Sequence, residues 1–234
     1  MSVPSQGFAQ RIDQLRTSLA GQGRRVQAQL ELAFAAVFMR DQSKASQAIT
    51  ADDEIDRVDV ELERAAVSLL VDATRETAQL DEGSLRWVLT IVKINNELER
   101  IADAAVDVAE LVQPCMAMQT IFPDTFRVMA NSCVGILRDT NTCLLRSDPL
   151  LAKVVLQSQH AVTAFKAAIL RDCEEKIARG VMSVEFAFRL HELASQCELM
   201  ADHCTNMAEQ IIYVTTGKIV RHTPAESVEV NRRS

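Results

Sequence analysis

The chain has 234 residues and a net charge of −7, with 48% apolar but only 4% aromatic residues. So few aromatic residues, together with only 7 glycines and 5 prolines, are typical of an all-α protein. The acidic balance argues against a nucleic-acid-binding protein, which needs a basic surface, and the absence of an 18-residue apolar run argues against direct membrane insertion.

The N-terminal segment and the cysteines indicate a cytoplasmic protein. The first seven residues lack the basic and apolar regions of a signal peptide. No cysteines form a C-x-x-C pair or show zinc-ribbon spacing, so we expect them to be reduced thiols of the core. They are Cys115, Cys133, Cys143, Cys173, Cys197 and Cys204.

Three long helices are predicted in the first half of the chain, over residues 7–41, 44–77 and 85–111. Gly21 and Gly23 are expected to loosen the middle of the first helix. Turns at 41–43 and 81–84 are short, which favours an antiparallel three-helix bundle.

The second half repeats this plan after breaks at Pro114 and Pro123. Helices are predicted over residues 125–146, 150–179 and 183–216, with Gly217 as a C-cap. We therefore predict an all-α fold of two pseudo-symmetric three-helix bundles, residues 1–118 and 119–222, followed by a flexible tail at 223–234.

Acidic residues form lines along the flank of two helices in the first half. Such like charges four residues apart repel by roughly 0.2–0.5 kcal/mol per pair, so the lines favour binding of a cation. One line is Asp52, Asp56, Asp59 and Glu63, and the other is Glu99, Asp103, Asp107 and Glu110.

A similar line recurs about a hundred residues later, which indicates a duplicated unit. It consists of Glu198, Asp202, Asn206 and Glu209.

The acidic lines of the first half predict a metal site if the second and third helices are neighbours. Asp52 and Asp56 would then face Glu99 and Asp103, with Asp107 as a fifth ligand. Carboxylates without His or Cys suit Mg²⁺, Ca²⁺, Mn²⁺ or iron better than a structural zinc ion. The alternative is a solvated acidic surface without a ligand.

The second half lacks the partner carboxylates. Gln159, Thr163 and Lys166 stand where the first half has acids, so we expect a weakened or lost second site at Glu198, Asp202 and Asn206. His203 is expected to be a surface or interface residue and not a ligand. No catalytic residues are predicted, since the helices carry no E-x-x-H motif and the chain has no G-x-S-x-G or phosphate-binding loop.

Four motifs resemble the PhoU family of phosphate-uptake regulators. Glu99–Asp103 and Glu198–His203 are similar to the paired E-R-I-G-D and E-R-I-G-D-H signatures of that family. Asp52–Asp56 resembles its acidic D-x-x-I-D opening, and Ile212–His222 resembles its ending in Gly followed by Val-Arg-His. The resemblance spans roughly residues 5–222.

The resemblance implies a non-enzymatic negative regulator of the phosphate-starvation response. Such a protein would be an adaptor between the ATPase of the Pst phosphate transporter and a PhoR-type sensor histidine kinase. It would be a homodimer, and it would reach the inner face of the membrane through these partners. The resemblance also implies metal clusters on the paired acidic motifs, with iron, zinc, manganese or magnesium as the divalent or trivalent ion.

Three alternatives remain open from the sequence. The chain could be an accessory of another phosphate or ion carrier, a carboxylate-bridged metalloenzyme, or a helical scaffold with a solvated acidic surface.

Overall fold

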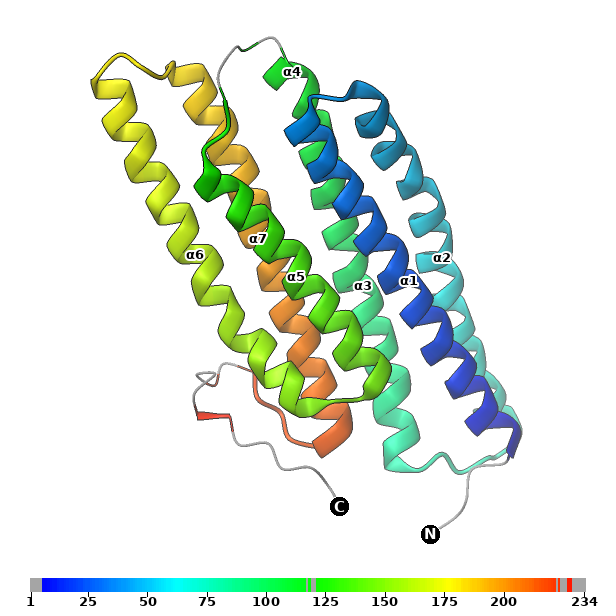
Figure 1. Ribbon diagram of the computed structural model, residues 1–234. Coiled ribbons are helices and arrows are strands. Elements are labelled where there is room, and N and C mark those ends of the chain that lie inside the picture. The colour runs from blue at the N-terminus through cyan, green and yellow to red at the C-terminus, as the bar shows by residue number, and fades with distance from the viewer. Residues whose placement is uncertain (1–5, 117, 119–120, 222, 224–226, 229–234) are drawn as a thin grey trace.

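The computed structural model describes residues 6–116, 118, 121–221, 223, 227 and 228, and every regular element among them is a helix. The predicted all-α class is therefore confirmed for this part of the chain (Figure 1). The helices are α1 (Gln6–Met39), α2 (Gln42–Arg75), α3 (Glu82–Glu110), α4 (Val112–Met116), α5 (Asp124–Arg146), α6 (Pro149–Ala178) and α7 (Val184–Thr216).

Local capping residues set the helix boundaries. Asp41 and Asp81 accept hydrogen bonds from backbone N–H groups three residues ahead, at the starts of α2 and α3. Asp148 does the same for α6, whose first residue, Pro149, has no N–H to satisfy. Gly217 ends α7 in the left-handed conformation, with φ 77°, as predicted.

The six long helices form two three-helix groups that lie side by side. Helices α1, α2 and α3 pack against one another, and α5, α6 and α7 form the corresponding group (Figure 1). The groups meet where α3 contacts α7 and where α1 contacts α5. Corresponding helices of the two halves therefore pair across the centre of the molecule.

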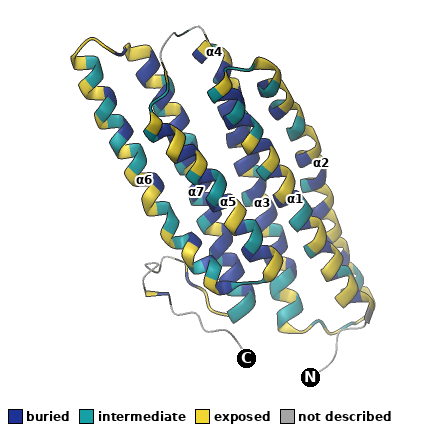
Figure 2. Ribbon diagram, viewed as in Figure 1, coloured by how far each residue is buried: buried dark blue, intermediate teal, exposed yellow. Residues whose placement is uncertain are grey.

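One hydrophobic core runs through both groups. Leu98 of α3, Leu137 of α5 and Met207 of α7 are fully buried members of the same cluster of apolar side chains. Figure 2 shows the buried faces of the long helices turned toward this interior and the exposed residues on the outer surface. The predicted boundary between residues 118 and 119 thus lies between two halves that share a core.

The glycines of α1 do not loosen it, contrary to the expectation above, because α1 is continuous from Gln6 to Met39. At Gly23, a Cβ atom would clash with Oδ1 of Asn141 on α5. Nδ2 of Asn141 donates a hydrogen bond to the Gly23 carbonyl at 2.8 Å. Gly23 thus allows α1 and α5 to approach closely.

All six cysteines are free and buried, which confirms the prediction of core thiols. No described helix is long and apolar enough to span the membrane. Of the predicted tail, residues 224–226 and 229–234 lie outside the described part, while Val228 is buried at 1% exposure.

Candidate functional site: an acidic cluster between α2 and α3

Helices α2 and α3 pack against each other and bring their acidic flanks together. Apolar residues such as Ile55 and Leu98 are fully buried, whereas the carboxylates on the flanks of the two helices are half-buried or exposed. We call Asp52, Asp56, Asp59, Glu99 and Asp103 the acidic cluster.

Glu99 is the residue most affected by this arrangement. Its pKa is raised from 4.5 to about 7, first by burial and then by the charge of Asp103, a hydrogen bond with that residue, and the charges of Asp59 and Asp56. Carboxylates of α2 and α3 therefore lie close enough to influence one another's ionisation.

Asp52 occupies the other end of the acidic cluster. Burial raises its pKa, and the charges of Asp56 and Asp103 act in the same direction. Nε2 of Gln29 on α1 opposes this shift by donating a hydrogen bond to Oδ1 of Asp52 at 3.0 Å. The four residues first predicted for the site thus influence one another electrostatically.

Asp59 belongs to the acidic cluster although it was not among the predicted ligands. Nδ2 of the buried Asn95 on α3 donates to Oδ1 of Asp59 at 2.6 Å and to its backbone carbonyl at 3.0 Å. Burial raises the pKa of Asp59, followed by the charges of Glu63 and Asp56. Its position on the acidic line of α2 was the signal in the sequence.

The structure places Asp107 on a different side of α3. Four residues advance a helix by about 400°, so a line of residues at this spacing turns by roughly 40° at each step. Oδ2 of Asp107 consequently accepts a hydrogen bond from Nε2 of Gln196 on α7, at 2.8 Å.

In the second half, neutral and cationic groups meet the remaining acids. Nζ of Lys166 on α6 lies 2.7 Å from Oε2 of Glu198, and Oγ1 of Thr163 donates to Oε1 of Glu198 at 3.2 Å. The bond from Lys166 is the main reason that the pKa of Glu198 is lowered. Gln159 donates a hydrogen bond to Asp202, whose pKa is raised chiefly by burial.

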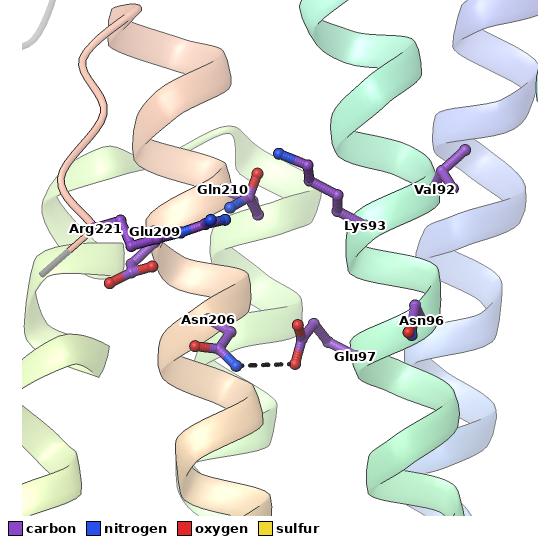
Figure 3. A pocket seen from close by; sticks show the side chains of 8 residues that line it. All are labelled: Val92, Lys93, Asn96, Glu97, Asn206, Glu209, Gln210 and Arg221. Carbon is purple, nitrogen blue, oxygen red and sulfur yellow. Dashed lines mark hydrogen bonds between the residues drawn. The ribbon is translucent and has the colours of Figure 1, made fainter.

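Asn206 contacts α3 and not the α6 residues that meet Glu198 and Asp202, and this contact was not predicted from the sequence. Its Nδ2 donates to Oε2 of Glu97 on α3 at 3.1 Å (Figure 3), and Nδ1 of His203 lies 2.7 Å from the same oxygen. Burial raises the pKa of Glu97, but the bonds to His203 and Asn206 outweigh it and hold the pKa below its usual value. The buried His203 is thus an interface residue between α3 and α7.

The donor chemistry of the acidic cluster fits a hard cation, because its charged ligands are all carboxylate oxygens. Within the described residues, however, no three His, Cys, Asp or Glu side chains are already positioned to hold a metal ion. Binding would require the carboxylates to close around the ion.

The chain is similar to known proteins in both of its halves. The family model for the PhoU domain matches it twice, at residues 19–112 and 126–211, one match in each half. A homologue of the phosphate-specific transport system accessory protein PhoU from Pseudomonas aeruginosa is 27% identical over 236 residues, which cover 97% of this chain and 95% of the relative. PhoU homologue 1 from Thermotoga maritima is also 27% identical, over 74% of each chain.

Two crystal structures share the fold. PhoU from P. aeruginosa has a TM-score of 0.83 at 23% identity, with 90% of this chain and 100% of that chain covered. The phosphate transport system regulatory protein PhoU from Streptococcus pneumoniae has a TM-score of 0.81 at 20% identity, with coverages of 91% and 99%.

Proposed function

The chain belongs to the PhoU family, and from this premise we propose that it is an accessory protein that regulates phosphate uptake. The observation that carries the proposal is the double match to the PhoU domain, one in each three-helix group. The family consists of regulatory accessory proteins and not of enzymes, which argues against the metalloenzyme alternative.

The specific role we propose is negative regulation of the phosphate-starvation response. The protein would be a cytoplasmic adaptor, docking on the ATPase of a Pst phosphate transporter and on a PhoR-type sensor kinase, with a homodimer as the working form. The support is that relatives covering nearly the whole chain are named as accessory proteins of phosphate-specific transport.

Deletion of the gene in its own host tests this role. In phosphate-rich medium we expect the deletion strain to express its starvation genes, measured as alkaline phosphatase activity and high-affinity phosphate uptake. The wild-type gene should restore repression. An unchanged response in the deletion strain would contradict the role and would favour an accessory of another carrier.

We also propose that the acidic cluster binds a divalent or trivalent metal ion. Asp52, Asp56, Glu99 and Asp103 are the proposed ligands, and Asp107 could join them only after a change in its contacts with α7. Support comes from the pKa of Glu99, which burial and repulsion by the neighbouring carboxylates together raise to about 7, since a bound cation would relieve that repulsion. The ion would stabilise this acidic surface or bridge it to a partner.

Metal analysis tests this site directly. Protein purified without chelator should contain about one or more bound ions by mass spectrometry, and Glu99→Ala/Asp103→Ala should lose them. Glu174→Ala/Glu175→Ala, which removes two exposed acids from α6, is the matched control and should retain the wild-type content. Equal metal content in all three proteins, or none in any, would refute the site.

A further inference from the structure

A polar hollow lies between α3 and α7, away from the acidic cluster. Its volume is about 570 Å³, and it adjoins a smaller hollow of about 170 Å³. The two share Lys93 of α3, Glu209 and Gln210 of α7, and Arg221 from the segment that follows α7 (Figure 3). We call them together the α3–α7 hollow.

Gln210 lines this hollow and has an unsatisfied acceptor. The residue is only 8% exposed, and its Oε1 atom has no hydrogen-bond partner among the described residues. A buried carbonyl oxygen without a partner is unfavourable, because it has lost its hydrogen bonds to water. A ligand that donates a hydrogen bond to Oε1 of Gln210 would therefore bind favourably here.

Two cations reach into the same space. Figure 3 shows the side chains of Lys93 and Arg221 extending toward Gln210 from α3 and from the segment after α7. Neither cation forms an ion pair or a side-chain hydrogen bond within the described part of the chain.

The carboxylates of the hollow are already engaged. Glu97 accepts hydrogen bonds from Asn206 and His203, and Glu209 also has an interaction partner. The charges left without a partner in the hollow are therefore cationic.

We propose that the α3–α7 hollow binds a singly protonated phosphate group, either free or as a phosphomonoester. Its anionic oxygens would contact Lys93 and Arg221, and its remaining O–H would donate to Oε1 of Gln210. A guanidinium and an ammonium suit phosphate oxygens. Sulfate and carboxylates carry no proton at neutral pH, whereas a phosphate group titrates near this range and can keep one O–H.

The smaller hollow would hold the organic part of an ester. It is lined by Leu89, Tyr213 and Val220, which offer an apolar surface beside the two cations. This binding goes beyond the proposed regulation of uptake and does not depend on it, because it follows from the side chains around the hollow.

Titration calorimetry on the full chain tests the proposal. Protein and buffers are treated with chelator, so that a metal in the acidic cluster cannot capture the anion. The probes are inorganic phosphate, glycerol 3-phosphate and sulfate at equal ionic strength. We expect phosphate or the ester to bind at least about tenfold more tightly than sulfate, because sulfate leaves Gln210 unpaired.

The relative affinities of inorganic phosphate and glycerol 3-phosphate show whether the ligand is free phosphate or a phosphomonoester. Tighter binding of glycerol 3-phosphate supports a phosphomonoester, and equal or tighter binding of inorganic phosphate supports the free ion. Sulfate binding as tight as phosphate, or no binding of any probe at millimolar concentration, would overturn the proposal. Neither result would affect the deletion experiment that tests the regulatory role.

Variants at exposed positions separate specific binding from general charge. Lys93→Met and Arg221→Met should each weaken phosphate binding by about tenfold or more, since each removes a charged hydrogen bond. Arg171→Met, at an exposed arginine of α6, should leave the affinity unchanged. A similar loss in all three variants would indicate charge attraction alone and would refute the site.

Discussion

The ionisation of Glu99 depends on two neighbouring helices. The residue lies on α3, but the charges that raise its pKa come from Asp56 and Asp59 of α2 as well as from Asp103 of its own helix. A carboxyl with a pKa of about 7 changes its protonation near neutral pH, so the acidic cluster can lose or gain charge under mild conditions.

Glu99→Gln should stabilise the metal-free protein, but only at higher pH. The folded pKa of about 7 lies above the ordinary value of 4.5, so the folded state holds this proton more tightly than the unfolded state. The free energy of unfolding therefore falls as pH rises from 4.5 to about 7, and the penalty persists above that range. The variant removes the penalty. Thermal melts in chelator should show a higher Tm than wild type at about pH 8 and little gain at about pH 4.5.

Glu110→Gln, at an exposed acid of the same helix, provides the control for this experiment. It should show a much smaller difference in Tm from wild type at both pH values. An equal gain for Glu99→Gln at low and high pH would mean that the stabilisation comes from packing and not from ionisation.

At the scale of the helices, the second half replaces carboxylates with groups that neutralise them. Lys166 and Thr163 of α6 contact Glu198, and Gln159 contacts Asp202. The corresponding positions of α2 are acidic. The pair α2–α3 therefore carries uncompensated negative charge, whereas the equivalent pair α6–α7 is partly neutralised.

Gln159→Asp/Thr163→Asp/Lys166→Ala should give the second half an acidic cluster like that of the first. If the first cluster holds metal, this variant should bind about twice the wild-type amount, because the lysine no longer competes for Glu198. Metal content by mass spectrometry and circular dichroism provide the measurement and the check on folding. Wild-type metal content in a folded variant would contradict the expected equivalence of the two helix pairs.

The helices were predictable from sequence because their signals are local. Asp41, Asp81 and Gly217 mark helix ends by capping, and the apolar period identifies the buried faces. The acidic lines on α2 and α3 were visible for the same reason.

Contacts between distant helices were not predictable in the same way. The contact of Gly23 with Asn141 joins α1 to α5, and the bond between Glu97 and His203 joins α3 to α7. Their spacing along the chain carries no periodic signal. The direction of Asp107 was also missed, because a line at four-residue spacing gradually turns around the helix.

At the scale of the whole molecule, the shared core protects every thiol. Burial, together with the charges of Asp148 and Asp139, raises the pKa of Cys143 to about 12, and burial is the main cause of the raised pKa of Cys204. A hydrogen bond with Cys197 and burial raise the pKa of Cys133. Because the thiolate is the reactive form, these side chains are shielded both sterically and chemically.

The folded protein should therefore react very slowly with Ellman's reagent at about pH 8, and all six thiols should react in denaturant. The rate of the slow reaction should follow opening of the fold. Leu98→Ala, which leaves a cavity in the fully buried core, should accelerate it. Prompt reaction of one or more thiols in the folded wild type would contradict this protection.

The pairing of α3 with α7 and of α1 with α5 has a consequence for connectivity. The beginning of α1 and the end of α7 lie at the same end of the molecule, while α4 lies at the opposite end (Figure 1). A circular permutant that starts just before α5 and joins α7 to α1 through a flexible linker would keep every helix contact. Such a protein should melt cooperatively with wild-type helical content, measured by circular dichroism, and its failure to fold would show that the order of the halves matters. If it folds, the order in which the two halves are encoded is free to change while the helix packing is preserved.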